Sequence, residues 1–219
     1  MDRRQFIAGV LAGMAATPSM AGSGLLSGAS GPLIDMSGGF SLYEKHDLEP
    51  EPVAAPRARP AEIELPTGNP TLSMYNVHTE ETLRVQPVSA TGFDHDGLAR
   101  VNRFMRDWRR NEVAQIDPNA ILGLLQIQQR ARRNGFSGNV RFLSGYRSQA
   151  TNDALRASGV NAARNSLHIQ AKAIDFSLPG VGIPQTILLA KDLDIGGVGG
   201  YSSFVHIDTG RVRFWGTAV

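Results

Sequence analysis

Hydrophobic and polar residues alternate in two neighbouring segments near the middle of the chain. The alternation covers residues 72–77 and 82–85 and is interrupted by the polar residues 78–81, which predicts two strands joined by a turn. After this hairpin the spacing changes to three and four residues, which is typical of an amphipathic helix and predicts one over 93–110. The residues that carry this spacing are Leu98, Val101, Phe104, Met105 and Trp108.

A second helix is expected over residues 118–133. Asp117 is suited to be its N-cap and Pro118 to occupy its first position, while an apolar face follows at helical spacing. Short elements complete the pattern, with strands expected over 139–143, 171–178 and 204–208 and helices over 149–157 and 184–193. Helices first and strands later, with short connections, predict an α+β domain with an antiparallel sheet and flanking helices.

The first 21 residues have the form of an export signal. Arg3 and Arg4 precede an apolar run over 7–16, and small residues end at Ser19-Met20-Ala21. The twin arginine predicts twin-arginine (Tat) export to the periplasm, and the small residues predict a signal-peptidase site. An uncleaved anchor is the alternative, although the apolar run is shorter than the roughly 20 residues that a membrane span needs.

Residues 22–70 are rich in Gly, Ser, Pro and Ala and are expected to form a disordered linker. The remaining residues, 71–219, are enough for one domain with its own core. We therefore expect a signal segment (1–21), a linker (22–70) and a single catalytic or binding domain (71–219).

The composition excludes several classes of function. The 22 basic and 20 acidic residues nearly balance, and no run of Lys or Arg is long enough for a nucleic-acid surface. There are no cysteines, so thiolate metal sites, iron–sulfur clusters and cysteine nucleophiles are excluded. A transition metal would have to be held by histidine and carboxylate.

Asp175 is the most informative single residue, because a carboxylate between Ile174 and Phe176 in an apolar strand is costly to bury alone. His168 precedes the same strand, and His206 lies in another expected strand. Two imidazoles and one carboxylate leave a fourth tetrahedral position for water, as in catalytic zinc sites. The alternative is that both histidines are ordinary core residues and that Asp175 pairs with Arg147 or Lys172.

Four motifs resemble a known family of enzymes. Residues 166–175 (SLHIQAKAID) resemble the S-x-H-x-x-G-x-A-x-D signature of zinc D-Ala-D-Ala peptidases and VanX-like dipeptidases, which share a fold with the hedgehog signalling domain. Together with 144–148 (SGYRS), 196–199 (GGVG) and 204–215 (FVHIDTGRVRFW), this signature is similar to the YcbK/MepK-type murein endopeptidases. The resemblance runs in the same order through most of residues 72–215.

The resemblance implies a zinc peptidase with His168, Asp175 and His206 as the metal ligands. It also implies hydrolysis of peptide cross-links in peptidoglycan, particularly those that join two diaminopimelate residues. The chain departs from the broad signature in having Ala171 in place of Gly, which we expect to be tolerated unless the backbone there needs a positive φ. It also has Ser203 where VanX-like enzymes carry an acidic general base.

Asp208 is our candidate to compensate for Ser203, because it lies two residues after His206 and so on the same strand face. It could act as the general base or as an outer carboxylate that orients a ligand. The resemblance also places Arg147 near the active site, where it could stabilise an oxyanion or bind a substrate carboxylate. An exposed loop arginine is the alternative.

Two rival functions are open from the sequence. One is a D-Ala-D-Ala-type carboxypeptidase, and the other is a zinc-containing cell-wall-binding module without catalytic activity. Peptidoglycan peptides are the expected partner in each case, with no nucleic acid and no membrane span beyond the signal segment. The sequence leaves open whether a regulatory lipoprotein controls the domain and in which oligomeric state it works.

Overall fold

The computed structural model describes residues 65–89, 91–160 and 162–218. The expected signal segment and residues 22–64 of the expected linker lie outside these ranges. Residues 65–70 contain no helix or strand, and the first strand begins at Leu72. No helix in the described ranges is long and apolar enough to cross a membrane.

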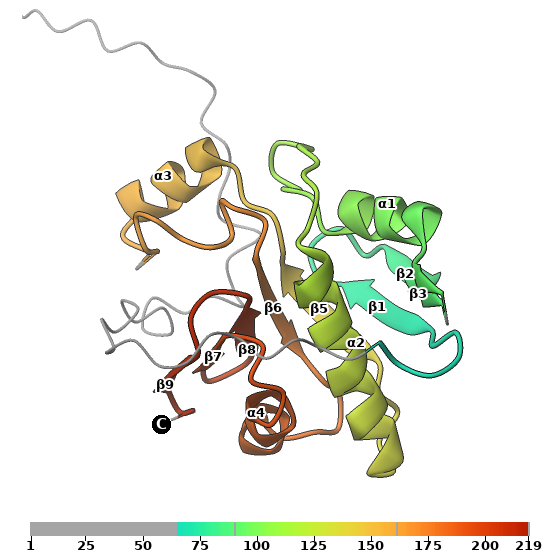
Figure 1. The fold of residues 1–219 in the computed structure, drawn as a ribbon. Coiled ribbons are helices and arrows are strands. Elements are labelled where there is room, and N and C mark those ends of the chain that lie inside the picture. Colours follow the sequence, from blue (N-terminus) through green and yellow to red (C-terminus); the bar gives the residue numbers. More distant parts are fainter. Residues whose placement is uncertain (1–64, 90, 161, 219) are drawn as a thin grey trace, which may run out of the picture. The chain divides into compact units, whose positions relative to one another are not determined.

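Seven strands form one sheet in the order β2-β1-β5-β6-β8-β7-β9 (Figure 1). The strands are β1 (Leu72–Asn76), β2 (Thr82–Val85), β5 (Val140–Ser144), β6 (Ala173–Ser177), β7 (Gly197–Gly200), β8 (Val205–Asp208) and β9 (Arg213–Gly216). The sheet is mixed and not purely antiparallel as the sequence predicted, because β1 pairs with β5, and β7 with β9, in parallel. The α+β class itself is confirmed.

In the described ranges, four helices accompany the sheet. They are α1 (His95–Phe104), α2 (Pro118–Arg133), α3 (Gln149–Ala157) and α4 (Ile183–Lys191). The prediction for α2 is confirmed at both ends, and the side chain of Asp117 caps it by accepting a hydrogen bond from the backbone N–H of Asn119. The prediction for α1 was too long, because the helix ends with Met105 as its C-cap and Trp108 follows in a turn.

The hydrophobic core lies on the face of the sheet that α2 and α4 cover (Figure 1). Ile174 and Phe176 of β6 and Val205 and Ile207 of β8 are all fully buried in it. Because neighbouring side chains on a strand point to opposite faces, Asp175 and His206 must point away from this core. The hydrophobic pattern therefore places the polar chemistry on the other face of the sheet.

Some strands were not predicted from the sequence. The Gly-rich segment forms β7, the chain continues after β8 into β9, and a two-stranded sheet joins β3 (Val88–Ser89) to β4 (Gly92–Phe93). Glycine has low strand propensity, so β7 gives no hydrophobic alternation of its own. Its pairing with β8 and β9 supplies the hydrogen bonds that make it a strand.

Candidate metal centre

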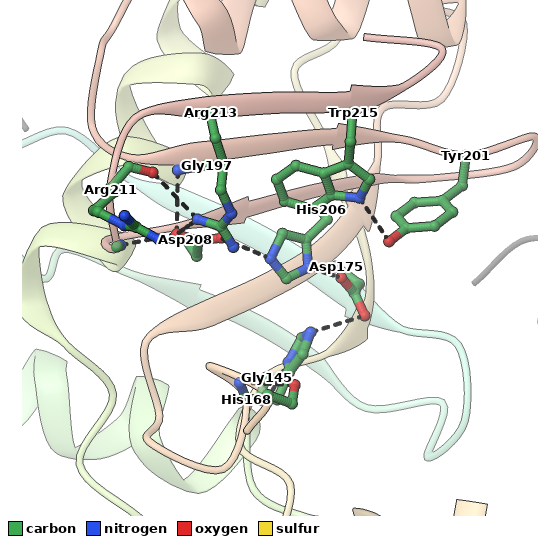
Figure 2. A network of polar contacts seen from close by, with 12 residues as sticks. Gly145, His168, Asp175, Gly197, Tyr201, His206, Asp208, Arg211, Arg213 and Trp215 are labelled. Carbon is green, nitrogen blue, oxygen red and sulfur yellow. Dashed lines mark hydrogen bonds and ion pairs between the residues drawn. The ribbon is translucent and has the colours of Figure 1, made fainter. Parts of the chain in front are cut away.

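Three side chains predicted to bind metal meet on the face of the sheet opposite the hydrophobic core. Asp175 and His206 are direct neighbours in the antiparallel pairing of β6 with β8. One carboxylate oxygen of Asp175 lies 2.8 Å from Nδ1 of His206 and the other lies 3.2 Å from Nε2 of His168. One ligand atom of each residue lies within 4.8 Å of the other two, and all three residues are buried. Figure 2 shows the carboxylate between the two imidazoles.

His168 reaches Asp175 from the turn that precedes β6. Its Nδ1 lies 2.7 Å from the carbonyl oxygen of Gly145, and a carbonyl can only accept, so Nδ1 carries the hydrogen. Burial holds the pKa of His168 below its ordinary value, and Arg147 adds to this although Asp175 opposes it. In the neutral ring Nε2 is therefore an acceptor that faces a carboxylate oxygen. Two acceptors at 3.2 Å need a proton or a cation between them, so this pair fits a metal ion.

His206 lies between two carboxylates. Its Nε2 is 3.1 Å from Oδ2 of Asp208, on the far side of the ring from Asp175 (Figure 2). Burial opposes a charge on His206, but the hydrogen bonds to Asp175 and Asp208 outweigh it and raise the pKa of His206 to about 9. The pKa values of both carboxyls are well below their usual range despite burial, because the histidines, and Arg213 beside Asp208, favour the anions. Without metal, His206 is thus an imidazolium that must lose the Nδ1 proton to become a ligand.

Asp208 has no exposed surface and uses both oxygens. Its Oδ1 accepts from the backbone N–H groups of Gly197 (3.1 Å) and Gly210 (2.8 Å) and from Nη1 of Arg213 (3.0 Å). Its Oδ2 faces His206 and lies 2.9 Å from Nη2 of Arg213. The prediction that Asp208 shares the face of His206 is confirmed. Its carboxylate is fully engaged in fixed hydrogen bonds.

The glycines of β7 explain how side chains of β9 reach across the sheet. Gly197 is paired with Arg213, and Gly199 lies between Trp215 and His206 in the pairing of β9, β7 and β8. A Cβ atom on Gly197 would collide with the guanidinium of Arg213, and one on Gly199 with the indole of Trp215. Without these Cβ atoms, Arg213 crosses β7 to Asp208 and Trp215 comes to 5.2 Å from the ring of His206.

An aromatic cluster borders the metal centre. Leu143, Tyr201, Phe204 and Trp215 pack together on this face, and Nε1 of Trp215 donates to the hydroxyl of Tyr201 at 3.0 Å. This hydrogen bond and the contact with His206 fix the indole. The sequence pattern assigns no role to Tyr201, Arg213 or Trp215, because their contacts depend on pairing across β7.

Asp175 does not pair with Arg147 or Lys172, the alternative that the sequence left open. Nη1 of Arg147 donates to Oδ1 of Asn152 at 3.3 Å, and Lys172 is exposed on the turn before β6. The two oxygens of Asp175 face the two histidines instead. This arrangement differs from an ordinary core ion pair.

Arg147 is buried and not an exposed loop residue, with 6% of its surface accessible. Its backbone N–H donates to the carbonyl of His168 at 3.2 Å, which ties the two loops together. Its Nε has no hydrogen-bond partner among the described residues. The next residue, Ser148, is held by the buried carboxylate of Asp107, which accepts from its backbone N–H and its hydroxyl. Arg147 is thus a buried positive charge close to His168.

The two departures from the signature have different structural outcomes. Ala171 has a positive φ of +57°, a conformation that glycine adopts freely and that costs alanine about 1 kcal/mol. Ser203 is exposed in the turn between β7 and β8. The turn residues His78 and Glu80 form no metal cluster within the described ranges, and His78 stacks on Trp108.

A sequence profile of the family described as peptidoglycan L,D-endopeptidase MepK matches residues 66–215. The chain belongs to this family. It is 37% identical over 162 residues to peptidoglycan L,D-endopeptidase MepK of Escherichia coli (strain K12), covering 71% of this chain and 86% of that protein. It is also 39% identical over 147 residues to a probable MepK of Haemophilus influenzae, covering 66% of this chain and 77% of that protein. No solved structure matches. Membership of the MepK family confirms the resemblance and supports a peptidase activity on peptidoglycan.

Proposed function

We propose that the chain is a zinc-dependent murein endopeptidase that hydrolyses amide bonds in peptidoglycan cross-links, including those between two diaminopimelate residues. The observation that carries the proposal is the buried set of His168, Asp175 and His206, whose ligand atoms lie within 4.8 Å of one another. Each histidine also has an acceptor behind its ring, which is the usual support of a metal-bound imidazole. The relatives named above supply the substrate class.

The ligand set suits zinc because two neutral imidazoles and one carboxylate are common in catalytic zinc sites. Zinc in such a site supplies Lewis acidity, which makes water a usable nucleophile at neutral pH. The carbonyl of Gly145 holds the tautomer of His168 that leaves Nε2 available. The carboxylate of Asp208 favours the neutral tautomer of His206 that carries its hydrogen on Nε2, which leaves Nδ1 available.

For Asp208, the surroundings favour the orienting role over that of general base. A carboxylate that already accepts from two backbone N–H groups, Arg213 and His206 has a low pKa and is a weak proton acceptor. For Arg147, the proposed role is to stabilise an anionic oxygen of the substrate through the positive charge of its guanidinium. Peptidoglycan lies outside the cytoplasmic membrane, so the Tat export expected from residues 1–21 is part of the proposal.

The test is hydrolysis of soluble cross-linked muropeptides of defined linkage by the purified protein, followed by chromatography and mass spectrometry. We expect cleavage of the cross-link, loss of cleavage with a chelator and recovery with added zinc. His168→Ala should behave like the chelated protein. His95→Ala is the matched control, because His95 is exposed on α1.

Two outcomes would contradict the proposal. Release of terminal D-Ala with intact cross-links would indicate a carboxypeptidase. Zinc binding without cleavage of any bond would indicate a wall-binding module.

A further inference from the structure

A groove of about 710 Å³ opens on the sheet at the opposite end of β5 from the loop that holds His168. Its lining comes from β1, β2, β5 and the end of α2. Three arginines line it, Arg84, Arg132 and Arg141, together with Tyr75. No aspartate or glutamate is among its lining residues. The groove is therefore positively charged, and none of His168, Asp175 and His206 lines it.

The charges of these arginines are not neutralised by neighbouring carboxylates. Arg132 donates to the carbonyl oxygens of Thr71 (3.2 Å) and Ser137 (3.4 Å), which orient the guanidinium without cancelling its charge. Arg84 and Arg141 are exposed. None of the three takes part in an ion pair within the described residues. Arginines clustered in a concave site raise the local concentration of anions, and their planar groups fit carboxylates.

The strand residues Tyr75 and Arg141 of the groove lie on the same face of the sheet as the metal centre, and Arg132 reaches the groove from the end of α2. Tyr75 is paired with Arg141, and Arg141 with Ser177, so these side chains form a row across β1, β5 and β6. Ser177 is two residues beyond Asp175, on the same face and about 7 Å along the strand. Figure 1 shows β1, β5 and β6 side by side.

Apolar residues connect β1 with the metal centre. Val77 follows Tyr75 by two residues and packs against the cluster that contains Leu143 and Trp215. Trp215 in turn contacts His206. A bound chain could thus run from the metal centre over this apolar surface to the arginines.

We propose that this groove is a second substrate subsite, which binds the carboxylate-bearing stem peptide next to the cross-link being cleaved. The proposal rests on the proposed function, because it names the part of the murein strand that extends away from the scissile bond. Stem peptides carry free carboxylates, which match the arginines in charge. Tyr75 is 39% exposed, and its ring offers an apolar surface against which the peptide can pack.

The test uses a double charge reversal, Arg84→Glu with Arg141→Glu, in the full chain. Arg132 is left unchanged because its hydrogen bonds hold the loop before β5. The control is Arg133→Glu, an exposed arginine on α2 outside the groove. Thermal melting of all variants checks that they fold.

Two measurements are made. One is co-sedimentation of chelator-treated protein with purified sacculi at low and high salt. The other is steady-state cleavage of a soluble cross-linked muropeptide with complete stem peptides. We expect the double variant to bind sacculi about 10-fold more weakly at low salt and to have a KM raised by a similar factor, with kcat within about twofold. Arg133→Glu should match the parent.

Equal binding and equal KM in the double variant and in Arg133→Glu would overturn the subsite. A fall in kcat at unchanged KM would also overturn it, because it would indicate damage to the metal centre. Arginine-dependent binding to sacculi by a parent protein that cleaves nothing would support the groove as a wall-binding surface and contradict the endopeptidase function. The two proposals therefore fail separately.

Discussion

Replacing Asp208 by asparagine would distinguish a residue that orients a metal ligand from one that takes a proton from water. The substitution preserves volume and removes one charge. The amide oxygen can still accept from the backbone N–H groups of Gly197 and Gly210, as Oδ1 does now. The amide NH₂ then takes the place of Oδ2 and faces Nε2 of His206. Since an NH₂ group donates, Nε2 must accept, so the one proton of the neutral ring lies on Nδ1, the atom that faces Asp175, and not on Nε2.

The size of the effect follows from these contacts. A His206 protonated at Nδ1 cannot bind metal through that atom, and loss of an outer partner of a metal-bound histidine typically weakens metal binding 10- to 100-fold, or about 1.4–2.8 kcal/mol. Arg213 also loses the carboxylate that lies 2.9 Å away, where the side chains are 10% and 0% exposed. Breaking a buried ion pair costs about 3 kcal/mol or more, so we expect a comparable fall in the free energy of unfolding.

The assay is a competition titration with a chromophoric zinc chelator, together with cleavage kinetics over a range of zinc concentrations. We expect weaker zinc binding in Asp208→Asn and recovery of kcat to within about 10-fold of the parent when zinc is saturating. Asp192→Asn makes the same chemical change at an exposed residue and serves as the control. Zinc affinity equal to that of the parent with a collapsed kcat would refute the reasoning and make Asp208 the proton acceptor.

Gly199 of β7, the backbone at Ala171 and the two shifted histidines give four further predictions. Gly199→Ala should lower the free energy of unfolding by about 2 kcal/mol and change the fluorescence of Trp215, because the new Cβ meets the indole; an unchanged spectrum and melt would contradict this. Ala171→Val should destabilise the domain by about 2 kcal/mol in chemical denaturation, because a branched side chain is disfavoured at φ +57°, and a neutral effect would be the contrary result. The apparent zinc affinity should rise about tenfold per pH unit from pH 7 to about 9 and then level off, since His206 must lose its proton; a flat titration would contradict the pKa of about 9. Burial, with a contribution from Arg109, lowers the pKa of His78 to about 4. Between pH 6.5 and 4, His78 is therefore protonated in the unfolded chain but neutral in the folded one. The free energy of unfolding should fall as the pH drops through that window. Since His78 is only partly buried, we expect a loss of about 1–2 kcal/mol that is absent in His78→Phe, and equal pH dependence of the two proteins would refute it.

The elements that follow from local sequence were predicted well. α2 has an N-cap at Asp117, proline at its first position and an apolar face, and each of these acts within a few residues. The hairpin of β1 and β2 likewise follows from alternation and a polar turn. The prediction for α1 was too long because Met105 and Trp108 keep the helical spacing after the helix has ended.

The candidate ligands were also accessible from the sequence. An aspartate within an apolar strand is costly unless something positive compensates it, and this cost is a property of the residue and its immediate neighbours. Asp208 could be placed on the face of His206 by the period of two. Its role could not, because that depends on Gly197, Gly210 and Arg213, which come together only in the folded sheet.

The sequence by itself determined which residues could hold a metal, which face of each strand is apolar and where most helices and strands lie, because these follow from side-chain chemistry and short-range periodicity. Only the tertiary structure decided that β7 is a strand, that its glycines let Arg213 and Trp215 reach across to β8, and that three arginines line one groove. These features arise from pairing between segments far apart in the chain. Outside a hairpin such as β1–β2, pairing between strands is set by the packing of the whole sheet, so local alternation alone does not encode it.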